Sequence, residues 1–516
     1  MSSSQTSTGE RVVRDTAKQY AGQLVVGAFA LAFAAWLNRL LPAKELALWP
    51  VCTSLGGVVA ACASFGLGDT FVRLVPALLA KGEREAAGAV LKTGLLLNLV
   101  GCAVLATAVY LLAEPAARYL LKDVGQAPMV QTMAFAAFFT ALAERLNWAM
   151  QAVQQFGKQA IIKTASGTLR TPLAVGLYLF LGTARGVIIA LTIVPIISCV
   201  LSIVWLWPHL WVSRRMHPLR PLLGFSLPFY GVSLIGLLSA RVNNLVIALL
   251  VRPEVLATYF VAQSIANYVD ALNRFAVAAT RPKLAEKSAQ DPDGAERVFT
   301  KCTRYVFLWL LPAHVLVAVA AAPLLRIYGG PNYVTASPVL IVMCAALLIG
   351  VLVDIQWAHI QILAKPVHLL ALSACQGVEN LAALALLVPR LGALGAALSD
   401  GAVALLQLVI SMTLLRRTIR TMYDHQAMAL AVFGSGVAGL VLYITSPLWQ
   451  TQAWVVLPLI VLAALTYNLS LARKLQEPDV ELLIRALPQR FRQSRTGAAV
   501  VRGVKWLWLK PSEGAI

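Results

Sequence analysis

Long apolar segments alternate with short polar loops along most of the 516-residue chain. Segments of about 20 apolar residues recur from Tyr20 to Leu471, and each is long enough to cross a hydrocarbon core of about 30 Å as a helix. Gly, Pro and charged residues mark the segment ends. The pattern predicts fourteen helices, at residues 20–41, 47–67, 88–112, 127–150, 160–182, 186–212, 225–251, 255–280, 303–325, 336–363, 367–388, 393–415, 427–447 and 453–471.

The composition agrees with an all-α polytopic membrane protein. Hydrophobic residues make up 59% of the chain and charged residues only 13%, whereas an ordinary soluble domain carries about 25% charged residues. A soluble enzyme, a collagen and a disordered chain are therefore excluded.

Basic residues show which side of the membrane the loops face. The formal net charge is +20, and most Lys and Arg residues fall in alternate loops, in segment 1–19 and in segment 472–516. Cytoplasmic loops are enriched in Lys and Arg, and an even helix count puts both ends on one side, so both termini are predicted to be cytoplasmic. Trp506 and Trp508 among basic residues favour binding of the C-terminal segment to anionic membrane lipids, with a solvated tail as the alternative. Nucleic-acid binding is not expected.

Motifs for catalysis or metal binding do not stand out. The sequence has no Gly-rich phosphate loop that ends in Gly-Lys-Ser/Thr and no His-Glu-x-x-His. Its seven cysteines lie in or beside apolar segments without paired spacing, which is typical of small apolar packing residues. We expect no cofactor, no metal site and no enzymatic activity.

Several stretches resemble one transporter family. They are NRLLPAKELALW, SFGLGDTFVRLVP, VNNLVIALLVRPEVLATYFVAQSIANYVDALNRFAVAATRPKLAE, RIYGGPNYVTASPVL and VPRLGALGAALSDG. Over residues 12–420 the chain resembles the Wzx-type polysaccharide and O-antigen flippases, whose superfamily also contains multidrug (MATE) exporters and lipid II flippases. The match lies in the order and spacing of diffuse motifs.

The resemblance implies an organisation and a cargo. It implies two six-helix bundles around a central cavity that opens alternately to either side, and a polyprenyl-pyrophosphate-linked oligosaccharide moved from the inner to the outer leaflet of the bacterial cytoplasmic (inner) membrane. The cargo would serve lipopolysaccharide or exopolysaccharide synthesis, with a polymerase and export machinery as further partners. The predicted parts are an N-tail 1–19, a bundle 20–212, a linker 213–224, a bundle 225–415, two helices in 427–471 and a basic tail 472–516.

A polar stripe on predicted helix 255–280 is the clearest candidate site. Gln263, Asn267, Asp270 and Arg274 are spaced four, three and four residues apart, so they share one helical face. One interpretation is a cavity wall whose amides bind sugar hydroxyls and whose arginine binds phosphate. The other is contact between helices, with Asp270 and Arg274 neutralising each other.

Other arginines fall inside predicted helices, where a charge at mid-bilayer costs at least about 2.5–3.5 kcal/mol. Arg241, beside Asn244, suits phosphate because its guanidinium donates two parallel hydrogen bonds, or it pairs with Asp270. Arg170 is a further cavity candidate. Arg145 either lines the cavity or extends to the lipid headgroups.

Two interior acids, Glu379 and Asp354, are candidates for ion coupling. A carboxylate that binds H⁺ or Na⁺ in one conformation can connect an ion gradient to transport. The alternative is a structural acid that is hydrogen-bonded inside the bundle.

The functions that compete with a flippase differ in their chemistry. A MATE-like exporter of cationic drugs should have a net acidic cavity, whereas the interior of this chain has an excess of Arg. A membrane glycosyltransferase or polysaccharide polymerase normally places its active site in a large outer loop, and the predicted outer loops are short. The sequence therefore favours the flippase.

Overall fold

A computed structural model shows how the chain folds. It describes residues 27, 31–32, 34–213, 215–290, 292–363, 366–416, 424–451 and 455–470. Segments 1–19 and 472–516, and half of the predicted helix 20–41, lie outside the described residues. The described part is almost entirely helical and contains no strand, which confirms the predicted all-α fold.

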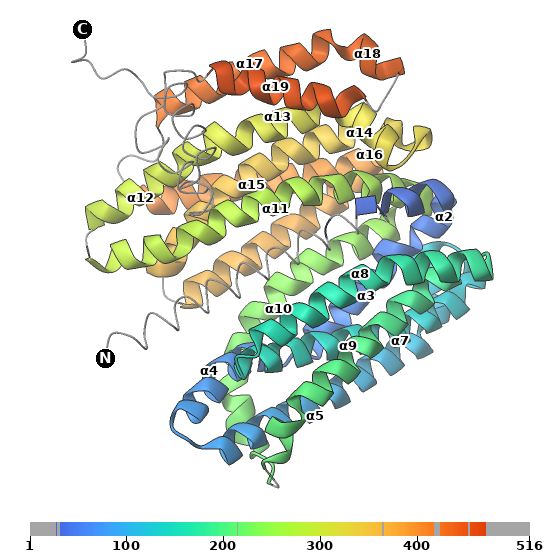
Figure 1. Cartoon of the computed structure of the whole chain (residues 1–516), viewed down its shortest axis with the longest axis vertical. Coiled ribbons are helices and arrows are strands. Elements are labelled where there is room, and N and C mark those ends of the chain that lie inside the picture. Colours follow the sequence, from blue (N-terminus) through green and yellow to red (C-terminus); the bar gives the residue numbers. More distant parts are fainter. Residues whose placement is uncertain are drawn as a thin grey trace, which may run out of the picture. The chain divides into compact units, whose positions relative to one another are not determined.

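The helices follow one another with short connections (Figure 1). Their bounds are α2 Ala43–Leu46, α3 Leu48–Cys62, α4 Leu67–Ala80, α5 Arg84–Leu111, α6 Ala113–Ala116, α7 Ala127–Ala152, α8 Phe156–Leu181, α9 Arg185–Trp211, α10 Leu219–Leu250, α11 Pro253–Gln290, α12 Pro292–Tyr305, α13 Leu311–Val319, α14 Ala321–Tyr328, α15 Ser337–Leu363, α16 Pro366–Leu415, α17 His425–Ile444, α18 Ser446–Thr451 and α19 Val456–Ser470. Two π-helical segments, η1 (Ala117–Leu121) and η3 (Val306–Leu310), and two 3₁₀-helical segments, η2 (Val124–Gln126) and η4 (Pro331–Ala336), complete the order. Seven of the described helical stretches are long and apolar enough to cross a membrane.

Helices occupy two stretches where the sequence predicted loops, since α4 follows α3 closely and α11 and α12 fill most of 281–302. The chain leaves α3 through a tight turn in which Phe65 and Gly66 have φ of 44° and 68°, and it continues as α4, where a loop was expected. The predicted helices 367–388 and 393–415 are both present as the two parts of α16, and their boundary lies in the predicted gap 389–392. A break at Gly392, with φ 57° and ψ −129°, separates its two parts.

Internal contacts divide the chain into two compact units. The first contains the described residues of Met1–Val261, Tyr328–Gly330 and Lys365–Ser399. The second contains those of Ala262–Ile327, Pro331–Ala364 and Asp400–Ile516.

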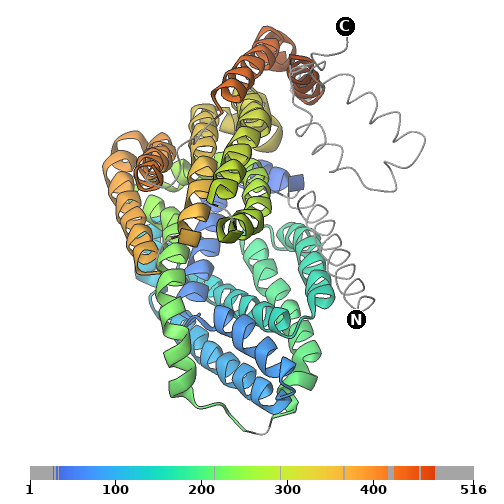
Figure 2. The ribbon, with the colours of Figure 1, turned by 90° about the vertical axis from the view of Figure 1, so that its left-hand side faces the viewer.

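The first unit has a continuous apolar core between α4, α5, α7 and α9. Phe71, Leu91, Met150 and Leu206 are almost completely buried there. Tight helix contacts accompany this packing: a Cβ atom at Gly88 of α5 would come within 2.7 Å of the His209 carbonyl oxygen of α9. Helices α8 and α9 lie side by side along their length, as Figure 2 also shows. The core fixes the positions of α7, α8 and α9 relative to one another, and these helices carry the site described below.

In the second unit, α17 and α19 pack on α13 and on each other. Tyr467 of α19 donates its hydroxyl to the Leu308 carbonyl in η3. Arg304 Nη1 lies 2.8 Å from Asp424 Oδ2, and both side chains are largely buried. Asp424 also accepts a hydrogen bond from the Ala427 amide, at 3.0 Å, and so caps the N-terminus of α17.

Candidate functional site

A polar cavity of about 610 Å³ lies between α7, α8 and α9 in the first unit. This volume falls within the range of small-molecule sites. Its polar lining consists of Thr140, Glu144, Asn147, Trp148, Gln151, Gln159, Lys163, Ser166, Arg170 and Ser198.

Helix α8 lines the cavity with one face. Gln159, Lys163, Ser166 and Arg170 are spaced four, three and four residues apart, so they fall in one row along the helix. Ser166 Oγ lies 2.6 Å from Ser198 Oγ of α9, which joins the two walls. Lys163 and Arg170 remain exposed, and among the described residues neither forms a hydrogen bond or ion pair. Both cations are therefore available to a ligand.

The opposite wall is the face of α7 that carries Glu144, Asn147, Trp148 and Gln151. Asn147 Nδ2 donates to the Ala143 carbonyl at 3.0 Å, while its buried Oδ1 has no partner in the described part of the chain. Buried acceptors normally have a donor, so Asn147 Oδ1 marks a place for a ligand hydroxyl. Gln159 Nε2 donates to the Asn147 backbone carbonyl at 3.0 Å and ties α8 to α7 at this point.

The chemistry of the lining is mixed, with an excess of positive charge. Two cations, Lys163 and Arg170, face one carboxylate, Glu144, and several amides and hydroxyls surround them. The indole of Trp148 adds an apolar surface. In the described residues no group of three His, Cys, Asp or Glu side chains could hold a metal ion. The arrangement suits a ligand that combines hydroxyl groups with negative charge.

Of the predicted site residues, Arg170 lies in this cavity and Arg145 does not. The Arg145 side chain is only 5% exposed and points toward α4, where its Nη1 atom would lie 2.7 Å from a Cβ atom at Gly68. Consecutive residues of a helix point about 100° apart. Glu144 therefore faces the cavity while Arg145 is packed against the next helix.

A second group of predicted residues lies on α10 and α16 of the first unit. Asn380 Nδ2 donates to Asn243 Oδ1 at 2.7 Å, which joins the two helices. Asn244 has a buried Oδ1 without a partner among the described residues. Glu379 accepts a hydrogen bond from the Cys375 thiol at 3.1 Å. Arg241 lies on α10, and its side chain is outside the described part.

All four residues of the predicted stripe on α11 belong to the second unit. Asp270 and Arg274 form an ion pair one turn apart, and the Arg274 side chain remains 63% exposed. Asn267 is also exposed, whereas Gln263 and Asp270 are half-buried. The neighbouring Asn273 is buried and donates to the Leu347 carbonyl at 3.2 Å.

Asp354, the other acid predicted for coupling, is exposed on α15 of the second unit.

Sequence reasoning missed Lys163, Gln159 and Trp148. The spacing of Gln159, Lys163, Ser166 and Arg170 is the same as that of the stripe on α11, so the same periodicity argument could have found it. Lys163 stands close to the start of its helix and resembles one of the many basic residues that flank cytoplasmic loops. Trp148 gave no signal, because an aromatic residue in an apolar helix is usually a packing residue.

Solved structures with the same fold are membrane transporters. The lipid II flippase MurJ in an inward closed conformation matches with a TM-score of 0.70 and 12% sequence identity, over 88% of this chain and 97% of that chain. An inward-facing multidrug resistance MATE family transporter of the MOP superfamily matches with a TM-score of 0.62 and 15% identity, over 76% and 94%. A MOP superfamily transporter from Pyrococcus furiosus matches with a TM-score of 0.55 and 15% identity, over 78% and 95%. These likenesses define the fold as that of multi-pass membrane transporters.

The family model described as "Polysaccharide biosynthesis protein" matches residues 36–338, so the chain belongs to that family. No curated protein sequence gives a significant match. The chain is thus a helical membrane protein of polysaccharide biosynthesis with a flippase and transporter fold, as its resemblance to the Wzx-type flippases predicted.

Proposed function

We propose that the protein is a flippase for polyprenyl-pyrophosphate-linked oligosaccharide. It moves this cargo from the inner to the outer leaflet of the bacterial cytoplasmic membrane by alternating access, with both termini in the cytoplasm. The observation that carries the proposal is the cavity between α7, α8 and α9, in which Lys163 and Arg170 are free to bind and amides surround them. The family and the fold support the same function.

Each part of the cavity matches one part of such a cargo. The Arg170 fork and the Lys163 ammonium bind pyrophosphate or acidic sugars, because both donate charge-assisted hydrogen bonds to oxyanions. Asn147, Gln151 and Gln159 bind sugar hydroxyls, and these groups can both donate and accept. The excess of cations argues against a cationic drug as cargo.

Residues elsewhere contribute to the same cycle in this proposal. Arg241, Asn244, Gln263, Asn267 and Arg274 bind the cargo on α10 and α11, and Asp270 adjusts Arg274 through the ion pair that joins them.

Ion coupling is assigned to Glu379, with Asp354 as the alternative. A carboxylate that binds H⁺ or Na⁺ in only one conformation biases the return of the empty carrier. Arg145 holds α4 against α7 and so supports the cavity wall.

The test is translocation of polyprenyl-pyrophosphate-linked oligosaccharide by purified protein in liposomes. Each lost contact to a charged group should cost about 1.5–3 kcal/mol, or about 10- to 150-fold in binding. Lys163→Ala/Arg170→Ala protein should therefore lose translocation, while Lys163→Arg/Arg170→Lys protein should retain much of it. Arg118→Ala is the matched control, since Arg118 is exposed outside the cavity and pairs with Glu114. Normal translocation by the double Ala variant would refute the site.

A further inference from the structure

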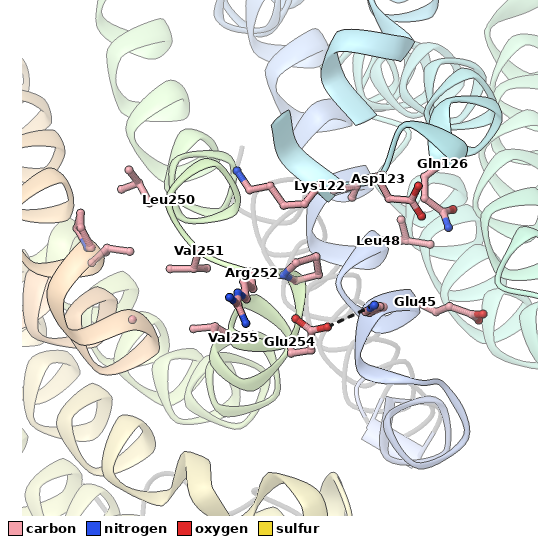
Figure 3. A pocket seen from close by; sticks show the side chains of 16 residues that line it. Glu45, Leu48, Lys122, Asp123, Gln126, Leu250, Val251, Arg252, Glu254 and Val255 are labelled. Atoms are coloured by element: carbon pink, nitrogen blue, oxygen red, sulfur yellow. Dashed lines mark ion pairs between the residues drawn. The ribbon is translucent and has the colours of Figure 1, made fainter. Parts of the chain in front are cut away.

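A second pocket lies in the first unit, away from the cavity between α7, α8 and α9. It has a volume of about 860 Å³ and is formed by four parts of the chain: the start of α2 and α3, the η1–η2 turn, the α10–α11 connection and the break in α16. Figure 3 shows Lys122, Asp123 and Gln126 along one side and Arg252 and Glu254 along another. All four parts lie in or beside outer loops of the predicted topology.

Contacts within the protein use only some of the hydrogen-bond donors and acceptors that line this pocket. Lys44 Nζ lies 4.0 Å from Glu254 Oε1, with side chains 80% and 46% exposed, and such exposed pairs contribute little. Lys122 Nζ donates to the Leu249 carbonyl at 2.8 Å and keeps two further donors. Within the described chain, the Arg252 guanidinium and the side-chain amide of Gln126 have no hydrogen-bond partner. Several donors and acceptors are thus open to a ligand.

The balance of charge indicates the class of ligand. Three cations, Lys44, Lys122 and Arg252, line the pocket together with three carboxylates, Glu45, Asp123 and Glu254. A strongly anionic ligand would be repelled by the carboxylates, and a cationic ligand by the basic residues. A neutral polyhydroxylated ligand can instead accept from the cations and donate to the carboxylates. Leu48, Leu121 and Val255 add apolar surface for the ring faces of sugars.

We propose that this pocket is an outer saccharide-binding site, which holds neutral sugar units on the release side of the membrane. The site differs from the cavity between α7, α8 and α9, where cations are in excess and charge selects the ligand. This proposal rests on the proposed function in one respect only: the outer side is the side of release if the protein moves its cargo outward. Binding of saccharide at the pocket does not depend on translocation.

The test measures protection of a cysteine placed in the pocket. Leu250 lines the pocket and is 39% exposed, so Leu250→Cys protein in right-side-out vesicles should react with a membrane-impermeant maleimide. The parent protein sets the background from the native cysteines. Maltotriose, chitotriose and rhamnose are added as neutral probes, with inorganic phosphate for comparison. We expect at least one neutral saccharide to slow labelling several-fold and phosphate to have little effect.

Two variants assign the protection to the pocket. Arg252→Gln in the Leu250→Cys background should abolish protection with an unchanged labelling rate in the absence of sugar, and Arg118→Gln, outside the pocket, should not change it. No labelling from the outer side, no protection by any neutral saccharide, or stronger protection by phosphate would overturn the proposal. Lys163→Ala/Arg170→Ala protein should keep the protection. If protection holds while the parent protein fails to translocate lipid-linked oligosaccharide, only the flippase proposal fails.

Discussion

Gly66 allows the α3–α4 turn to pack directly on α10, so its replacement by Ala should be strongly destabilising. Its φ of 68° lies in the left-handed region, where a residue with a side chain costs about 1–2 kcal/mol. A Cβ atom would also overlap the Ser226 carbonyl oxygen and lie 3.0 Å from the Tyr230 amide nitrogen. Both are backbone atoms of α10, which cannot rotate away as a side chain can.

The contacts around the turn show what would have to move. Tyr230 donates its hydroxyl to the Cys62 carbonyl at 2.8 Å, and its ring lies 5.9 Å from that of Phe65. Overpacking of this kind costs about 1–3 kcal/mol, so the total for Gly66→Ala is about 2–5 kcal/mol. Displacement of α10 would break the hydrogen bond and the ring contact together.

Gly82→Ala separates the two terms of this prediction. Gly82 has φ of 80°, but nothing lies within 4 Å of a Cβ atom there, so this variant should lose only the backbone term. The assay is thermal unfolding of purified protein in detergent, followed by tryptophan fluorescence at one scan rate. Gly66→Ala should unfold at a clearly lower temperature than Gly82→Ala. Equal temperatures for the two variants would refute the contact between the turn and α10.

Three further predictions concern topology, coupling and the second unit. A reporter fused after Thr183 should be external and one fused after His217 cytoplasmic, and an inverted result in a protease-protection assay would require a new topology. Glu379→Gln protein in liposomes should lose its response to an imposed H⁺ or Na⁺ gradient but keep downhill exchange; a response like that of the parent would make Glu379 structural. Asp424→Asn should lower thermal stability by loss of the pair with Arg304, and Asp424→Ala by about 1 kcal/mol more through loss of the helix cap; equal losses would contradict the capping role.

Periodicity predicted the fold because the bilayer leaves few alternatives. Every backbone polar group must be satisfied within the segment, so a long apolar run becomes a helix whatever its neighbours are. Departures occur where a tertiary contact decides. The turn at Phe65 and Gly66 depends on α10, more than a hundred residues later in the sequence. The break at Gly392, by contrast, falls in the predicted gap 389–392, where Pro389 and Arg390 interrupt the apolar pattern.

The candidate site was predicted less completely than the fold. A row of polar residues on one helical face does not show whether that face lines a cavity or contacts another helix. The four-three-four spacing placed Gln263, Asn267, Asp270 and Arg274 on one side of a helix, but the partner of Arg274 is Asp270 on the same helix. Arg145 and Arg170 looked alike as interior arginines. Only the packing of α4 on α7 shows that Arg145 is buried against Gly68 while Arg170 stays free.

The attachment of α17 and α19 to α13 determines where the gene can be shortened. Because α13 packs on α17, and Tyr467 donates to the Leu308 carbonyl, a chain that stops before Asp424 would leave an apolar face of α13 uncovered and would lose the ion pair between Arg304 and Asp424. Such a truncated product should be recognised by membrane quality-control proteases and accumulate poorly. In an expression or tagging strategy, these two helices belong to the folding unit and cannot be treated as a removable extension.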